Sequence, residues 1–287
     1  MHITESIETI IQSLVASEHN HLDAPFAGET AWDAPLVGYC KGDDPYFAFL
    51  TEHIGDDYLT PMKAYRIVYP SDPCEAKELL VVSFVLPQTD KVRRDQRQAT
   101  DIPAERWVHT RMEGHAFVRY LSAELADRLR EMGYPSLCPP ATEAFHIMDH
   151  STHYRTSNWS ERHTAYACHL GTFGLSRGLI TPRGIAHRLG SIILKANVDL
   201  PRRELPHYMA HCLRTQGIDC RRCIDRCPSG AITEEGMDKE KCRNYQLEHV
   251  FPDVTARYGI HDPMGCGLCQ CGVPCEAMQP KIKESKG

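Results

Sequence analysis

Cysteine is the residue type in this chain whose number and spacing point most directly to chemistry. Nine of the 13 cysteines follow residue 211 in a chain of 287 residues. Most of them fall into two runs, CRRCIDRCP at 220–228 and CGLCQCGVPC at 266–275. Cys212 precedes the first run, and Cys242 lies between the two. Thiolates are soft donors that hold transition metals and tolerate electron transfer, so this pattern predicts a metal centre in the C-terminal part of the chain.

The spacing C-x2-C-x3-C-P in the first run is typical of modules that bind 4Fe–4S clusters. The loop wraps around one cluster, and its last cysteine binds the second cluster in two-cluster ferredoxins. Eight thiolates satisfy two such clusters, and nine are clustered here. Two structural zinc sites are one alternative, which the Cys-Pro continuation and the cysteine count disfavour. A disulfide framework is the other, and a reducing cytoplasm disfavours it.

Because the last cysteine of the first run crosses over, the thiolates divide into two predicted sets. One cluster takes Cys227, Cys242, Cys266 and Cys269. The other takes Cys212, Cys220 and Cys223, and either Cys275 or Cys271 completes it. Cys271 follows Cys269 by two residues, and such side chains share a face in an extended chain, so Cys271 would stay beside the first set. Gly272 and Pro274 provide a turn back for Cys275, which is therefore our predicted ligand.

The elements that must position these centres lie before residue 200. Apolar residues at helical spacing predict helices over 7–14, 107–132 and 161–169. The β-branched run 79–86 predicts a buried strand, and strands are also expected at 179–181 and 191–194. The segment 28–61 is rich in Gly, Pro and Asp and is expected to form surface loops. Alternating strands and helices indicate an α/β or α+β domain over 1–200, followed by a second domain over 201–287.

Composition and charge exclude several classes of function. The net charge of −6 disfavours a broad nucleic-acid footprint. No apolar run of about 18 residues occurs, so no membrane span is expected. The first residues lack the features of a signal peptide, which predicts a cytoplasmic protein. Neither a G-x-G-x-x-G nor a Walker motif is present, so a nicotinamide or ATP site of those kinds is not predicted.

Two stretches upstream of the cysteines carry a family resemblance. They are NWSERHTAYACHLGTFGLS at 158–176 and GLITPRGIAHRLGSII at 178–193. Together with the cysteine runs, they resemble the epoxyqueuosine reductase and reductive dehalogenase superfamily, over roughly residues 150–276. The resemblance implies an α+β fold, in which a nitroreductase-like α/β cobalamin-binding domain precedes a small ferredoxin-like domain with two 4Fe–4S clusters.

The resemblance also implies a reaction. The clusters would pass single electrons to a base-off cobalamin, which would carry the reduction of a small organic substrate. The residues implied for the cofactor pocket are Trp159, Arg162, Gly171, Phe173, Gly174, Leu179, Ile180, Thr181, Arg188, Gly190 and Ser191. The candidate proton donors are Tyr154, Glu161 and His163. Turns and close packing are the alternative explanation for the glycines, and core packing is the alternative for Trp159 and Phe173.

The chain also departs from the family pattern. No Asp stands near Arg155, where epoxyqueuosine reductases carry an acidic proton donor. Gly217 replaces the leading cysteine of the first run, so Cys212 must substitute for it. Glu276 follows the last cysteine, where the family has Pro.

Further departures from the family pattern bear on which partners we expect. The sequence contains neither the helical-repeat tail that epoxyqueuosine reductases use for tRNA nor the twin-arginine leader of respiratory dehalogenases. A short cytoplasmic branch that does not act on tRNA is therefore expected. Its partners would be an electron donor such as ferredoxin or flavodoxin and a small-molecule substrate. The second hypothesis is an electron-transfer or cofactor-reactivating protein that acts on a partner and performs no substrate chemistry itself.

Overall fold

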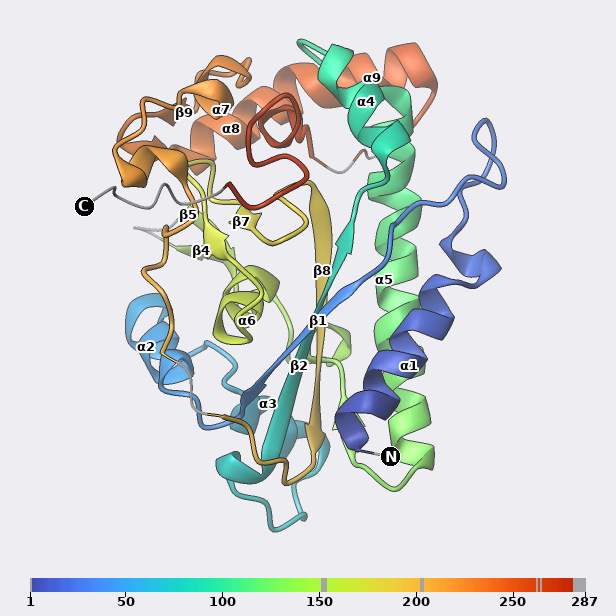
Figure 1. Ribbon diagram of the computed structural model, residues 1–287, viewed down its shortest axis with the longest axis vertical. Helices are drawn as coiled ribbons and strands as arrows, with labels where there is room; N and C mark the ends of the chain where they lie inside the picture. Colours follow the sequence, from blue (N-terminus) through green and yellow to red (C-terminus); the bar gives the residue numbers. More distant parts are fainter. Residues whose placement is uncertain (1, 151–153, 202–203, 262, 264, 281–287) are drawn as a thin grey trace, which may run out of the picture.

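The computed structural model describes residues 2–150, 154–201, 204–261, 263 and 265–280. A four-stranded sheet in the order β1-β2-β8-β3 forms its centre (Figure 1). The strands are Leu36–Lys41 (β1), Leu79–Pro87 (β2), Ser136–Leu137 (β3) and His187–Lys195 (β8). Every pairing in this sheet is antiparallel, and β2 pairs with β8 along its whole length. The mixed helix and strand architecture confirms the expected α+β fold.

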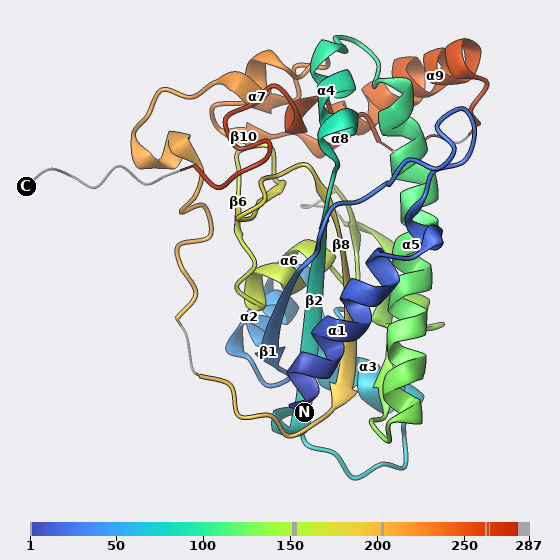
Figure 2. The same cartoon turned by 45° about the vertical axis from the view of Figure 1, so that its right-hand side comes forward.

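Helices cover both faces of this sheet (Figures 1 and 2). One face packs against α1 (Ile3–Val15) and α5 (Glu105–Glu131), and the other against α2 (Pro45–Ile54), α3 (Pro61–Val68) and α6 (Glu161–Ala167). Alternate side chains of a strand point to opposite faces. Accordingly, the side chains of β2 divide between the two cores, with Leu80, Val82, Phe84 and Leu86 in one and Leu79, Val81 and Val85 in the other. Because both faces are covered, the strand is apolar at every position except Ser83.

Shorter elements complete the described chain. They are α4 (Asp90–Gln98), β4 (Ile147–His150), β5 (Tyr154–Ser157), β6 (Thr172–Phe173), β7 (Leu179–Ile180), α7 (Arg222–Asp225), β9 (Ile232–Thr233), β10 (Gly236–Met237), α8 (Lys239–Tyr245) and α9 (Phe251–Tyr258). A π-helical turn, Gln246–Val250, joins α8 to α9. Among the described residues, no helix has both the length and the apolar character that crossing a bilayer requires.

The expected elements are present with shifted ends, and one segment differs from its prediction. The helices expected at 7–14, 107–132 and 161–169 are α1, α5 and α6, and the strand expected at 79–86 is β2. The prediction of loops over 28–61 is wrong, because this segment contains β1 and α2. The start of α2 has two helix signals, since Asp44 accepts a hydrogen bond from the Tyr46 amide and Pro45 occupies the first turn.

The cysteine-rich region packs across one end of the sheet and of α5 (Figures 1 and 2). Val250 and Val254 join a small core with Ile102 and Val108, which lie just before and within α5. The domain boundary predicted near residue 200 falls after β8, in a stretch whose described residues form no regular element before Leu213. The short elements of this region therefore depend on contacts with the sheet domain for their placement.

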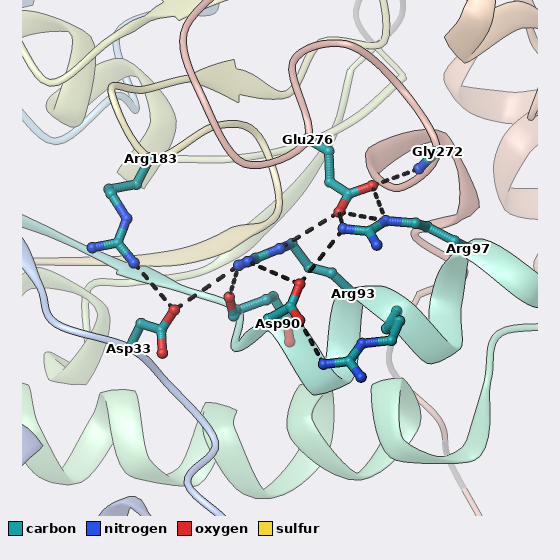
Figure 3. A network of polar contacts seen from close by, with 9 residues as sticks. Asp33, Asp90, Arg93, Arg97, Arg183, Gly272 and Glu276 are labelled. Atoms are coloured by element: carbon teal, nitrogen blue, oxygen red, sulfur yellow. Dashed lines mark hydrogen bonds and ion pairs between the residues drawn. The ribbon is translucent and has the colours of Figure 1, made fainter.

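A buried carboxylate joins the two regions (Figure 3). Glu276 is 6% exposed and accepts hydrogen bonds of 2.6–3.0 Å from the Arg97 guanidinium. The Gly272 amide donates a further hydrogen bond of 2.7 Å to the same carboxylate. Arg93 Nε lies 3.5 Å from Glu276 Oε1, and Asp90 Oδ1 lies 3.7 Å from both Arg93 and Arg97. The loop that holds the last cysteine is thereby attached to α4.

We predict that Glu276→Ala lowers the free energy of unfolding by about 3 kcal/mol, because it leaves Arg93 buried without its closest carboxylate. Urea unfolding of the cluster-loaded protein measures the change. The control Arg94→Gln removes an exposed ion pair with Asp90 and should cost less than about 1 kcal/mol. Equal losses in the two variants would contradict a special role for Glu276.

Candidate metal centres and cavity

The fold gathers eight of the nine C-terminal thiols into two groups. In the first group, burial raises the pKa of Cys266 to about 12, and the charges of Cys242 and Cys227 add to the effect. Cys269 belongs to the same group, because Cys266, Cys227 and Cys242 all raise its pKa as well. The second group surrounds Cys275, whose pKa is raised to about 12 by burial and then by the charges of Cys223, Cys212 and Cys220. Thiols in such surroundings ionise only when a bound cation compensates the charge.

Cys271 stands apart from both groups. It is 0% exposed and packs with Val92, Trp107 and Ala186. After burial, the largest effects on its pKa come from the charges of Glu276, Arg93, Arg97 and Arg226. The fold therefore places Cys275, and not Cys271, beside the thiols with which we predict it to share a cluster.

Local interactions hold the cysteine loops in shape. Asp238 accepts a hydrogen bond from the Lys241 amide and caps α8, which carries Cys242. Gln246 Nε2 donates to Cys242 Sγ at 3.2 Å. Gly267 has φ of +69°, and a Cβ at this position would lie 2.1 Å from the Trp107 ring. A glycine is therefore required where the chain turns between Cys266 and Cys269.

A large cavity of about 1730 Å³ opens beside these centres. The sheet domain contributes β1, α2 and α6 to its wall, and the cysteine-rich region contributes the turn between β9 and β10 and the first residue of α8. The segment 204–209 also lines the cavity. Two hydrogen bonds attach this segment to the sheet domain, from Tyr166 Oη to Pro206 O at 2.5 Å and from Phe173 N to Tyr208 O at 2.6 Å. The cavity thus lies where the two regions meet.

Aromatic rings form one continuous side of the cavity. Tyr46 lies edge-on to Tyr166, with ring centroids 5.0 Å apart. His163 lies 5.0 Å from Phe173, and Phe173 lies 5.8 Å from Tyr166. All four rings line the cavity. The sequence analysis did not identify Tyr46, because it lies in the segment expected to be loops, and no motif marked it.

Only some of the residues implied for the cofactor pocket reach this cavity. Arg162, Phe173 and Gly174 line it. The implied residues outside its wall are Trp159, Gly171, Leu179, Ile180, Thr181, Arg188, Gly190 and Ser191. Packing accounts for the two glycines, since a Cβ on Gly171 would lie 2.4 Å from the Ile180 carbonyl oxygen and one on Gly190 would lie 2.3 Å from the Phe84 ring.

The candidate proton donors occupy different surroundings. His163 lines the cavity, and burial lowers its pKa to about 3, so its ring is neutral at pH 7. Its Nδ1 makes no hydrogen bond to the described residues. Glu161 is the first residue of α6 and lies outside the cavity wall, near Trp159 and Ser191. Tyr154 begins β5, and its side chain lies outside the described part of the structure.

Glu161 belongs to a buried polar cluster. Trp159 Nε1 donates to Ser191 Oγ at 3.0 Å, and Trp159 is 1% exposed and stacks on Phe47. Burial raises the pKa of Glu161 to about 7, although hydrogen bonds from Ser191 and Trp159 lower it. Trp159 and Ser191 therefore pack in the core and orient this carboxyl group.

We predict that Cys275→Ser loses or converts one cluster, because it removes a thiol from the second group. Cys271→Ser should retain about eight iron atoms, the content of two 4Fe–4S clusters, and an unchanged EPR spectrum of the reduced protein. Iron analysis and EPR of anaerobically purified variants measure both outcomes. Loss of iron in the Cys271 variant alone would reverse the assignment.

We predict that Glu161 makes stability depend on pH. Its folded-state pKa of about 7 lies above the ordinary value of 4.5, so the stabilising proton is lost as the pH rises through this window. Between pH 5.5 and 7.5, the wild type should lose about 1–2 kcal/mol more unfolding free energy than Glu161→Gln. Urea unfolding at the two pH values tests this, with the exposed loop variant Glu143→Gln expected to follow the wild type. Parallel losses in wild type and Glu161→Gln would contradict it.

Comparisons with known proteins agree with this architecture. A model of the 4Fe–4S double cluster binding domain matches residues 216–274. No curated protein sequence matches the chain. The structure of epoxyqueuosine reductase from Streptococcus thermophilus aligns with a TM-score of 0.52 and 14% identity, over 98% of this chain and 68% of that one. A selenomethionine-labelled epoxyqueuosine reductase aligns with a TM-score of 0.50 and 15% identity, over 98% and 69% of the two chains.

A catabolic reductive dehalogenase aligns with a TM-score of 0.45 and 16% identity, over 84% of this chain and 33% of that one. The domain match supports the prediction of two 4Fe–4S clusters. The expected resemblance is confirmed at the level of the fold: the chain shares the fold of epoxyqueuosine reductase and carries a 4Fe–4S double cluster binding domain.

Proposed function

We propose that this protein is an iron–sulfur oxidoreductase whose two 4Fe–4S clusters supply single electrons to a base-off cobalamin that reduces a small organic substrate. The observation that carries the proposal is the cavity of about 1730 Å³ between the sheet domain and the cysteine-rich region. A simple electron carrier needs no such chamber, so its presence favours an enzyme over the carrier hypothesis.

The cysteine groups would hold the clusters next to the cavity. Cys227, Cys242, Cys266 and Cys269 would bind one cluster, and Cys212, Cys220, Cys223 and Cys275 the other. Arg111 connects the first group to the cavity, because its pKa responds to the charges of both Cys269 and the cavity residue Arg162. On the side of the second group, Gly174 and Leu175 line the large cavity and also a small pocket that Cys223 and Cys275 border. Both groups thus adjoin residues of the cavity wall.

The cavity residues fit a large flat cofactor. Drug-sized ligands occupy pockets of about 300–1,000 Å³, and this cavity is larger. The rings of Tyr46, Phe173 and Tyr166 offer apolar contact to a macrocycle, while Arg162 adds a cation at the same wall. Cobalamin bound there would supply reductive chemistry that protein side chains lack.

The chain's own residues would position the bound molecules and form hydrogen bonds with them. Segment 204–209 lines part of the cavity. His163 is a neutral imidazole in the wall, with an Nδ1 that no described residue satisfies, so it can form a hydrogen bond with a bound molecule. Of the candidate residues whose side chains the structure describes, it is the one that lines the cavity.

The partners follow from the same proposal. A reduced ferredoxin or flavodoxin would supply the electrons, and the substrate would be a small molecule. We propose no tRNA substrate, because the net charge of −6 offers little electrostatic attraction for phosphate backbones.

Binding of hydroxocobalamin to the anaerobic, cluster-loaded protein tests the proposal. We predict a spectral change and a rise in melting temperature, because a ligand that binds only the folded state stabilises it. Phe173→Ala should weaken binding about five- to tenfold through loss of a ring contact. Phe251→Ala removes a half-buried ring outside the cavity and should bind like the wild type.

The outcome separates the two functional hypotheses. If a protein with its full iron content shows neither a spectral change nor a melting shift at saturating cobalamin, the cobalamin proposal fails. The electron-carrier hypothesis would then replace it.

A further inference from the structure

Two thiols from distant parts of the chain meet in the wall of the cavity. Cys168 Sγ donates a hydrogen bond of 3.3 Å to Cys40 Sγ. Cys40 lies on β1 and Cys168 directly follows α6, and both residues line the cavity. They are 4% and 3% exposed, so a small molecule reaches them through the cavity.

Close packing between β1 and the end of α6 brings the two sulfurs together. Gly38 and Cys40 lie on the same face of β1, because side chains two positions apart in a strand share a face. A Cβ on Gly38 would lie 2.4 Å from the Cys168 carbonyl oxygen and 2.7 Å from Leu170 Cγ. The glycine therefore allows the chain that follows α6 to approach the strand closely. The Cys168 amide donates to the Thr164 carbonyl oxygen at 2.9 Å, which fixes this residue to the helix.

Neither thiol belongs to the predicted cluster ligands, and both pack among apolar side chains of the sheet domain. A buried cysteine usually behaves as a small apolar side chain. Cys74, which packs in the same core outside the cavity wall, is explained in that way. Packing alone requires neither a contact between two sulfurs nor a place in a cavity wall. The pair formed by Cys40 and Cys168 has both features.

We propose that Cys40 and Cys168 form a redox-active thiol pair, which a peroxide that enters the cavity oxidises to a disulfide. The two S–H bonds break and one S–S bond forms, while the two electrons and the two protons reduce hydrogen peroxide to two molecules of water. A disulfide bond is about 2.0 Å long, so the sulfurs need to approach each other by about 1.3 Å from their separation of 3.3 Å.

The disulfide would change the wall of the cavity. It would join β1 to the end of α6, and the first turn of α6 carries Arg162 and His163, which also line the cavity. Burial raises the pKa of the Cys40 thiol, so this thiol is protonated at neutral pH. Because the thiolate is the reactive form, the pair should oxidise more slowly than an exposed cysteine with an ordinary pKa.

Peptide mapping of the anaerobic, cluster-loaded protein tests the pair. Cys40 is the only cysteine of tryptic peptide 1–41, and Cys168 is the only cysteine of tryptic peptide 163–177. The protein is treated with stoichiometric hydrogen peroxide, and the remaining thiols are blocked with N-ethylmaleimide. Mass spectrometry then identifies linked peptides before and after reduction with dithiothreitol. Iron content establishes that the clusters are intact in each sample.

Cys168→Ser removes one member of the pair, and Cys74→Ser is the matched control from the same core. We expect linked peptides 1–41 and 163–177 in equal yield in the wild type and in Cys74→Ser. This yield should exceed that of any linkage through Cys74 at least about tenfold, because only neighbouring thiols can form a disulfide. In Cys168→Ser, Cys40 should remain open to N-ethylmaleimide.

Phenylarsine oxide measures the same proximity without oxidation. Its arsenic atom forms one bond to each of two neighbouring thiols, and its oxygen leaves as water with their two protons. It should raise the melting temperature of the wild type and of Cys74→Ser but not that of Cys168→Ser, because it binds the folded pair.

Other results would overturn the redox pair. If both thiols of the peroxide-treated wild type stay free, they are packing residues, whether or not phenylarsine oxide binds them. A linkage that forms only in protein that has lost its iron would also overturn the proposal, because it would follow from damage to the fold. None of these results depends on cobalamin, so a failure of hydroxocobalamin to bind would contradict the proposed function alone.

Discussion

The attachment of the last cysteine loop to the sheet domain is the contact on which the rest of this structure depends. Glu276 receives hydrogen bonds from Arg97 and from its own loop, and its carbonyl oxygen accepts from the Ile185 and Ala186 amides. Gly184 makes this approach possible, because a Cβ there would lie 2.2 Å from the Glu276 oxygen. A region built from short elements has little stability of its own, so this docking determines where its thiols lie.

The cavity is a consequence of that docking. Its walls come from β1, α2 and α6 on one side and from the β9–β10 turn and Lys239 on the other. Neither region encloses the space alone. The cysteine groups and the cavity thereby lie in adjoining parts of the molecule, since Gly174 and Leu175 line both the cavity and the small pocket that Cys223 and Cys275 border.

Only part of the stretch that carries the family resemblance lines the cavity. Trp159, Ser191 and Gly190 lie in the core or the sheet, whereas Arg162, Phe173 and Gly174 reach the cavity. Residues that are close in sequence thus lie in different surroundings, because successive side chains of a helix or strand point in different directions. Glu161 and His163 follow the same rule: the first is a buried carboxyl group with a raised pKa, and the second is a neutral ring in the cavity wall.

The sequence by itself determined the metal chemistry and the main elements. Cysteine spacing is local and chemically specific, and the long periodic segments of α5 and β2 follow from burial of their apolar faces. It did not reveal β1 and α2, whose signals are short and lie among glycines and prolines. Only the tertiary structure could separate Cys271 from Cys275, or bring Arg162, Phe173 and Lys239 together around one cavity. The physical reason is that these arrangements depend on contacts between segments far apart in the chain, which no local pattern encodes.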